Sequence, residues 1–308
     1  MKLIVQIPAY NEEENLRNVL REIPKKIDGI DEVQILVVND CSEDKTREIA
    51  LEENVDFIVD NYKRLGLAKT FMKGLEKSLK EGADIIVNID GDGQYPPKEI
   101  PKLIKPVQEK KAHLVIGNRS VSKLKHFSII KRFFQSFGTK IVRFLSSCDI
   151  KDATSGFRAF SRELALKTIV FSNYTYTLET ILQASQLGYE IFSVDISEVR
   201  ETKRKSRLMK SSFEYILKSG FELLRIFVLY NSLKTFIVLS FFFSLPGIFF
   251  FIRFLYYFLS GNGYGHIQSL IAGAVSLIIS FQIFLLGIIS DLISINRKLL
   301  EQIKNNNP

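Results

Sequence analysis

Two acidic residues that are separated by a single glycine form the first candidate site. Asp90 and Asp92 follow an apolar run, residues 83–88, that is typical of a buried strand. Side chains two positions apart on an extended chain point the same way, and Gly91 and Gly93 leave room for a ligand to approach the backbone. Convergent carboxylate oxygens suit Mg²⁺ or Mn²⁺ on substrate phosphates. The alternative is an acidic turn, because Asp-Gly is also ordinary turn chemistry.

Polar turns also follow two earlier apolar runs, residues 2–7 and 33–38. The polar or turn residues after these runs include Pro8, Tyr10, Glu12 and Asp40. Asn11 is expected to cap the first helix, and Ser42 or Asp44 the second. Strands that alternate with amphipathic helices predict a mostly parallel α/β sheet, which binds ligands beyond the carboxyl ends of its strands. The glycine fingerprint of dinucleotide enzymes is absent from the first turn, which argues against an NAD dehydrogenase.

Three ordered motifs resemble those of a known family. They are residues 8–12, 37–44 and 90–94. They resemble the nucleotide-sugar motifs of family 2 glycosyltransferases, in particular the group of dolichyl-phosphate mannose synthases and polyprenyl-phosphate sugar transferases, which have the GT-A fold. Residues 116–119 and 152–160 extend the resemblance over about the first two thirds of the chain. Asn39 and Cys41 stand where many members have Asp and Gly.

The resemblance implies roles for individual residues. The implied nucleotide-sugar contacts are Pro8, Tyr10, Glu12, Asp40, Asp90, Asp92, Gln94 and Arg119. The implied ligands of Mg²⁺ or Mn²⁺ are Asp90, Asp92 and Gln94. The implied catalytic residues are Asp92, Arg119 and Asp152. The implied contacts to the acceptor and its phosphate are Arg132, Ser155, Arg200, Lys205 and Arg207.

Residues 152–160 combine an acid, a turn of small residues and an alternating run that is typical of an edge strand. In the resembling family this segment borders the acceptor pocket, and Asp152 is expected to orient the acceptor or the sugar. The alternative is a capped turn with Arg158 as a solvated charge. Glu179 is expected on a helix that faces the same region, and the alternative is an exposed helix charge.

Two long apolar runs, residues 235–259 and 267–289, each exceed the roughly 20 residues that cross a bilayer. The loop 260–266 between them has no Lys or Arg, whereas basic residues precede and follow the pair. The positive-inside rule therefore predicts a cytoplasmic catalytic domain. Residues 120–147 are basic and rich in aromatic residues, which favours binding at a membrane surface, although a helix packed on its own domain is the alternative.

Composition narrows the class of partner. The net charge of +8 suits nucleic acid, an anionic membrane surface or anionic substrates, and the absence of zinc-ligand spacing or a helix-turn-helix pattern argues against nucleic acid. The two cysteines lie far apart in the sequence, so no disulfide framework is expected. The expected organisation is a catalytic domain (1–210), an amphipathic juxtamembrane region (211–234), a transmembrane hairpin (235–290) and a cytoplasmic tail (291–308).

Together these features predict a metal-dependent, membrane-anchored GT-A enzyme at the cytoplasmic face of a cell or endoplasmic-reticulum-type membrane. It is expected to transfer a hexosyl unit, with inversion, from GDP-mannose or a UDP-sugar to dolichyl or polyprenyl phosphate, which would supply lipid-linked sugar for glycosylation. A homo-oligomer is compatible with the sequence. The alternatives are a polysaccharide synthase of the same fold, against which the absence of Trp argues, and a non-catalytic membrane scaffold.

Overall fold

The structure is a computed structural model. It describes residues 1–119, 139–140, 142–143, 146, 148–170, 172, 176–196, 200 and 232–306, with the side chains of residues 297–306 excepted. The chain divides into a first unit, Met1–Leu217, and a second unit, Lys218–Pro308. Most of the segment 120–147, nearly all of the juxtamembrane region 211–234, and Arg132, Lys205 and Arg207 lie outside the described residues; residues 139–140, 142–143 and 146 are described and are helical.

The first unit contains a seven-stranded sheet with the order β3-β2-β1-β4-β6-β5-β7. The strands are β1 (Lys2–Ala9), β2 (Glu32–Asn39), β3 (Phe57–Asp60), β4 (Ile85–Asn88), β5 (Leu114–Asn118), β6 (Arg158–Ser161) and β7 (Ile191–Asp195). Every pairing is parallel except those of β6, which runs antiparallel to both β4 and β5. The mostly parallel sheet was predicted correctly. The prediction of an edge strand at residues 157–160 was wrong, because β6 lies inside the sheet.

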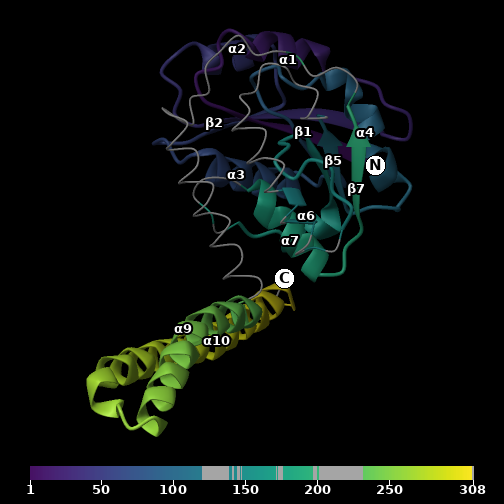
Figure 1. Cartoon of the computed structure of the whole chain (residues 1–308). Helices are drawn as coiled ribbons and strands as arrows, with labels where there is room; N and C mark the ends of the chain where they lie inside the picture. Colours follow the sequence, from purple (N-terminus) through teal and green to yellow (C-terminus); the bar gives the residue numbers. More distant parts are fainter. Residues whose placement is uncertain are drawn as a thin grey trace. The chain divides into compact units, whose positions relative to one another are not determined.

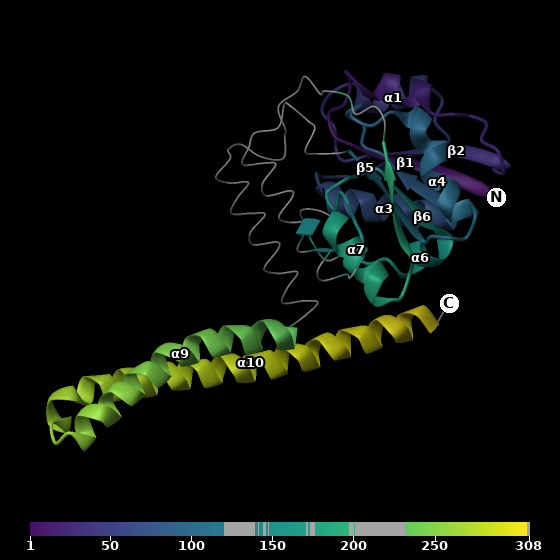
Figure 2. The ribbon, with the colours of Figure 1, turned by 45° about the vertical axis from the view of Figure 1, so that its right-hand side comes forward.

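Helices cover both faces of this sheet (Figures 1 and 2). They are α1 (Leu16–Glu22), α2 (Thr46–Glu52), α3 (Leu67–Lys80), the 3-10 turn η1 (Pro97–Glu99), α4 (Ile100–Gln108), α6 (Arg162–Lys167) and α7 (Thr177–Gln186). Alternate β1 residues, such as Leu3 and Val5, pack in one apolar cluster with α1, α2 and α4. On the other face Gln6 contacts α3, where its amide donates a 3.4 Å hydrogen bond to the carbonyl of Phe71. This alternation follows from the two-residue period of a strand.

Hydrogen bonds connect the turn after β1 to the turn after β2. Asn11 does not cap α1, because that helix begins at Leu16; instead the Asn11 Oδ1 atom accepts a 2.8 Å hydrogen bond from the Glu43 amide. Neither Ser42 nor Asp44 is the N-cap of α2, because Lys45 takes that position without a side-chain capping hydrogen bond; Asp44 Oδ1 still accepts a 3.0 Å hydrogen bond from the Thr46 amide. The polar turns are therefore tied to each other as well as to their own helices.

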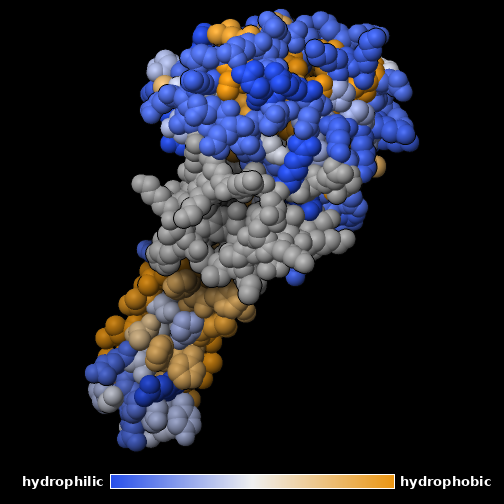
Figure 3. Space-filling model, turned by 90° about the horizontal axis from the view of Figure 1, so that it is seen from above, coloured by the Kyte–Doolittle hydropathy of each residue, from blue (hydrophilic) through white to orange (hydrophobic). Residues whose placement is uncertain are grey.

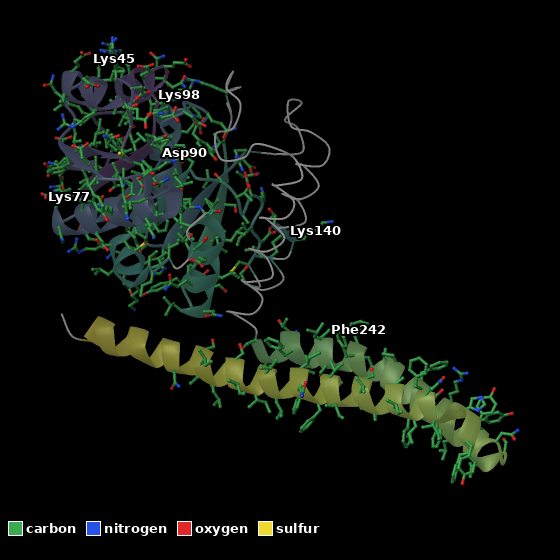
Figure 4. All side chains as sticks on the ribbon, turned by 90° about the vertical axis from the view of Figure 1, so that its left-hand side faces the viewer. Lys45, Lys77, Asp90, Lys98, Lys140 and Phe242 are labelled. Carbon is green, nitrogen blue, oxygen red and sulfur yellow. The ribbon has the colours of Figure 1, made fainter. Side chains whose placement is uncertain are left out.

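The second unit is a helical hairpin. It contains α9 (Ser232–Leu259), the 3-10 turn η3 (Gly263–His266) and α10 (Ile267–Asn306). Both helices are long and apolar enough to cross a membrane, with a mean hydropathy of 2.3 each, and only 11% and 17% of their most apolar windows are buried. Hydrophobic residues cover most of the hairpin surface in Figure 3, and Phe242 projects away from α9 in Figure 4. Low burial in the described part of the chain argues against core helices of a soluble domain and suggests membrane association. The helix α10 continues through most of the segment that was predicted as a tail.

Small residues let the two hairpin helices approach closely. A Cβ atom added to Gly273 would lie 3.1 Å from the carbonyl oxygen of Gly247, and one added to Gly287 would lie 2.6 Å from Cβ of Phe236. The Ser280 hydroxyl donates a 2.7 Å hydrogen bond to the Ser240 carbonyl. Close packing and interhelical hydrogen bonds of this kind stabilise helix association in lipid, because the hydrophobic effect contributes little to association there.

Candidate active site

The polar turns meet at the carboxyl edge of the sheet, as the sequence predicted. Strands β1 and β2 end together, at the pair Ala9 and Asn39, and the parallel strand β4 ends opposite Gln6, so the segments after all three strands leave the same edge of the sheet. Asp90 follows β4 directly and lies in the middle of the first unit, whereas the exposed Lys45 lies at its outer edge (Figure 4).

Asp90 is half-buried and strongly perturbed. Loss of hydration, followed by the like charge of Asp92, raises the pKa of Asp90 to about 7. The positive charge of Arg119 lowers the pKa of Asp90, and the negative charge of Glu12 raises it. Asp92, Arg119 and Glu12 therefore all lie near the Asp90 carboxylate. Among the described residues, no hydrogen bond or ion pair satisfies the Asp90 carboxylate. A carboxyl group in such surroundings suits a cationic ligand.

The segment after Asp90 is a tight turn. The Asp92 Oδ1 atom accepts a 2.9 Å hydrogen bond from the amide of Gln94, and Gln94 is buried. The carbonyl of Gln94 accepts a 3.0 Å hydrogen bond from the amide of Arg200, so residue 200 lies beside the turn. The Arg200 guanidinium, however, binds both carboxylate oxygens of Glu22 at 2.8 Å. Its predicted contact with a phosphate stays a prediction and would require exchange of this ion pair.

The residues at this turn fit a divalent cation that is shared with a substrate. Asp90 and Asp92 supply two acidic groups, and no cluster of three or more His, Cys, Asp or Glu residues that could hold a metal is present in the described part of the chain. Mg²⁺ is typically bound by one or two carboxylates and completes its shell with substrate phosphates and water. The two acids therefore suit a metal that arrives with a diphosphate, rather than one held by protein alone.

Arg119 and Asp152 form a buried ion pair next to the acidic turn. Arg119 Nε lies 2.7 Å from Asp152 Oδ2, one terminal nitrogen lies 3.1 Å from Oδ1, and that nitrogen also donates to Thr154 Oγ1 at 2.8 Å. The two side chains are only 7% and 1% exposed. Burial opposes the charged form of Asp152, but the charge and hydrogen bonds of Arg119 outweigh it and lower the pKa of Asp152. The carboxylate thus stays ionised and orients the guanidinium.

Arg158 is completely buried, so its interpretation as a solvated charge was wrong. Its guanidinium donates to the carbonyls of Ser155, Ala153 and Thr177 and to the Thr180 hydroxyl, at distances of 2.6 to 2.7 Å. Burial lowers the pKa of Arg158 to about 10, so the group is still charged at neutral pH. Arg158 therefore fastens the turn before β6 to the first turn of α7.

Two other residues of this region are also buried. Ser155 is 0% exposed and its hydroxyl donates to Tyr95 Oη at 3.3 Å, and its expected contact with the acceptor stays a prediction. Glu179 is 2% exposed, and its Oε2 atom accepts a 3.1 Å hydrogen bond from the amide of Ser172. The alternative of an exposed helix charge at Glu179 was wrong.

The expected nucleoside side of the site lies at β1 and β2. Pro8 is buried, whereas Tyr10 and Glu12 are half-buried, and the Arg64 guanidinium stacks 4.1 Å from the centre of the Tyr10 ring. Asp40 is 4% exposed.

The Asp40 carboxylate accepts hydrogen bonds from the Asn61 side chain and from the amides of Leu65 and Gly66, at 2.8, 2.8 and 2.9 Å. It thereby fixes the loop that carries Arg64. Its direct contact with a base or ribose stays a prediction.

Sequence reasoning missed several residues that support the site. They are Asn88, Tyr95, Tyr176 and Arg64. No motif marks the two tyrosines, which act through partners about 60 and 20 positions away. The position of Asn88 could have been recognised from the sequence, because a polar residue at the end of an apolar strand is costly to bury unless it is hydrogen-bonded.

Comparison with known proteins agrees with this geometry. The model of "Glycosyl transferase family 2" matches residues 4–168. The chain is 28% identical to an undecaprenyl-phosphate mannosyltransferase of Micrococcus luteus, over 68% of this chain and 88% of that one. It is 27% identical to a polyprenol monophosphomannose synthase of Mycolicibacterium smegmatis, over 72% of this chain and 85% of that one.

Solved structures show the same fold. Glucosyl-3-phosphoglycerate synthase from Mycobacterium tuberculosis, crystallised with Mn²⁺, UDP and glucosyl-3-phosphoglycerate, superposes with a TM-score of 0.52 at 21% identity, over 72% of this chain and 79% of that one. The predicted GT-A-like architecture is confirmed. Because the family model spans more than half of the chain and includes Asp90, Asp92, Arg119 and Asp152, the protein belongs to glycosyl transferase family 2 and is a glycosyltransferase.

Proposed function

We propose that this protein transfers a hexosyl unit from a nucleotide-diphosphate sugar, GDP-mannose or a UDP-sugar, to dolichyl or polyprenyl phosphate, with inversion at the anomeric carbon. The names of the mannosyltransferase relatives support a polyprenyl phosphate as acceptor. The two apolar helices support an enzyme that meets its acceptor in a membrane. The observation that carries the proposal is the acidic turn of Asp90 and Asp92 beside the buried Arg119–Asp152 pair.

Different side chains of the site would bind the metal and stabilise the substrate charge. Asp90, Asp92 and Gln94 would hold Mg²⁺ or Mn²⁺, which when bound acts as a Lewis acid toward the departing diphosphate. Arg119 offers a preorganised positive charge for the sugar or the diphosphate, since Asp152 fixes its direction before substrate arrives. The Mn²⁺ and Mg²⁺ in structures of the same fold support the use of a divalent metal.

Asp152 positions Arg119 and does not act as a general base. Its pKa is lowered and both of its oxygens bind Arg119, so it holds a proton poorly. A strong base is not needed, because a phosphate monoester is already anionic near neutral pH. In the proposed reaction an acceptor phosphate oxygen forms the new bond to the anomeric carbon as the bond from that carbon to the nucleoside diphosphate breaks.

We further propose that the catalytic domain faces the cytoplasm, with boundaries near residues 210, 234 and 290. The support is the distribution of basic residues, which flank the hairpin and are absent from the loop 260–266. Labelling of a cysteine introduced into that loop as Ser260→Cys, compared with labelling of Cys148, would test the orientation in intact cells. Labelling of the loop from the cytoplasmic side would contradict it.

The decisive experiment gives membranes that contain the protein a panel of labelled nucleotide sugars together with dolichyl phosphate. The expected result is label in the lipid phase with one donor, lost on chelation of divalent metal and restored by Mg²⁺ or Mn²⁺. Transfer to a glycan but not to lipid phosphate would favour the polysaccharide alternative. Absence of transfer and of nucleoside diphosphate release with every donor would overturn the enzymatic proposal.

A further inference from the structure

Gly156 lies directly against the Asp90 carboxylate. A Cβ atom added to Gly156 would lie 2.6 Å from Asp90 Oδ2 and 2.9 Å from Oδ1, distances that real Cβ atoms essentially never show. The φ angle of Gly156 is not in the left-handed region that favours glycine. Glycine is therefore required here by the lack of space beside the Asp90 carboxylate and not by the backbone conformation.

The peptide of Gly156 is held on both sides. Its amide donates to Tyr95 Oη at 3.1 Å. Its carbonyl accepts from Asn88 Nδ2 at 3.0 Å and from Tyr176 Oη at 3.1 Å. Asn88 also donates to Tyr176 Oη at 2.7 Å and accepts from the Gln6 amide at 3.0 Å, so the group forms a connected buried network. Hydrogen bonds on both sides restrain the Gly156 peptide, although Gln6 Oε1, at the end of this network, has no hydrogen-bond partner among the described residues.

The residues before Gly156 are held as firmly. Arg158 binds the carbonyls of Ala153 and Ser155, and Arg119 binds Asp152 and Thr154. Within the described residues Arg158 has no carboxylate partner, and burial of such a cation costs free energy. Hydrogen bonds to three carbonyls and a hydroxyl offset this cost, and their structural result is a rigid 152–156 turn.

We propose that Gly156 is a positioning residue for the Asp90 carboxylate, and that the network of Asn88, Tyr95, Tyr176 and Arg158 holds it there. The turn limits the directions that the carboxylate can take and so raises the affinity of the site for a divalent cation. This inference rests on the proposed metal-dependent function. Groups that orient a metal ligand without touching the metal commonly contribute 10- to 100-fold in affinity.

The test measures Mn²⁺ binding to the full-length protein in detergent by electron paramagnetic resonance, with UDP and GDP in parallel. Gly156→Ala should raise the Kd for Mn²⁺ by about 10- to 100-fold. The matched control is Gly287→Ala on α10, where the added Cβ would lie 2.6 Å from Phe236 Cβ, between the two hairpin helices and outside the network around Gly156. The control should retain the wild-type Kd even if its unfolding temperature falls by a similar amount.

A milder variant keeps the test decisive if Gly156→Ala does not fold. Tyr176→Phe preserves the ring, which stacks on Phe71 at 3.9 Å, and removes only the hydroxyl bonded to Gly156 and Asn88. It should raise the Kd by about 2- to 10-fold, the equivalent of one neutral hydrogen bond.

The results distinguish failure of the positioning role from failure of the proposed metal binding. If the wild type binds Mn²⁺ and the folded variants bind it equally well, the positioning role is overturned while the proposed function stands. If the wild type binds no Mn²⁺ with either nucleotide, the metal proposal and the inference that rests on it both fail. If Gly287→Ala weakens binding as much as Gly156→Ala does, the effect is general destabilisation and the inference is overturned.

Discussion

Removing one partner of the Arg119–Asp152 pair should destabilise the protein more than removing both charges together. The pair is almost fully enclosed, at 7% and 1% exposure, so it belongs with buried rather than surface ion pairs. Loss of one buried partner typically costs about 3–5 kcal/mol because the other charge is left uncompensated. We therefore expect about that loss for Asp152→Asn and for Arg119→Met, and a smaller loss for the double variant than for either single one.

The assay is unfolding of the detergent-purified chain in denaturant, followed by far-ultraviolet circular dichroism, for the wild type and the three variants. The cycle isolates the coupling between the two side chains from the other contacts of Arg119. Additivity of the two single losses to within about 0.5 kcal/mol would mean that the pair is not coupled, and would refute the reasoning.

The same pair predicts a pH dependence with a definite sign. Because the pKa of Asp152 is lowered below its ordinary value of 3.8, the stabilisation is present above that value and is lost as pH falls through the folded-state pKa. The stability gap between the wild type and Asp152→Asn should stay constant from about pH 7 to pH 5 and narrow only below about pH 4. A gap that closes between pH 7 and pH 5 would contradict an ionised, Arg-bound carboxylate.

Three further predictions follow from single positions. Asp92→Ala should abolish sugar transfer while leaving the protein resistant to carbonate extraction from membranes; substantial residual transfer would contradict the metal assignment. Cys41→Gly should stabilise the fold by up to about 1 kcal/mol with unchanged transfer, because Cys41 has a φ of 61°, which only glycine adopts without cost; a lower denaturation midpoint would oppose this. Gly287→Val should weaken the hairpin by forcing Phe236 away, seen as a lower unfolding temperature, whereas Gly265→Ala, with no neighbour within 4 Å, should not.

The sequence was sufficient for those parts of the site that depend on local pattern. Apolar runs that end in polar turns located β1, β2 and β4 and the sheet edge where their loops meet. The acidic turn was found because Asp90 and Asp92 are separated by only one residue in the chain. Their use by a metal or substrate is still a prediction.

The rest depends on contacts between residues far apart in the sequence. The alternation of residues 157–160 is the same for an edge strand and an interior strand, and only pairing with β4 and β5 distinguishes them. Arg158 could not be recognised as buried, because its partners are carbonyl oxygens, which every residue carries. Asp40 was assigned to a ligand from its motif, whereas its described hydrogen bonds fix the loop after β3.

The antiparallel strand β6 also sets the order in which the protein acquires its site. Asn88 on β4 pairs with Arg158 on β6, about 70 positions later, whereas β1 and β2 pair across about 30. Long-range pairing has a larger loop-closure cost and slows folding. In refolding experiments, pairing of β1 with β2 should therefore precede Mn²⁺ binding, because Asp90 gains its neighbour Gly156 only when β6 is inserted.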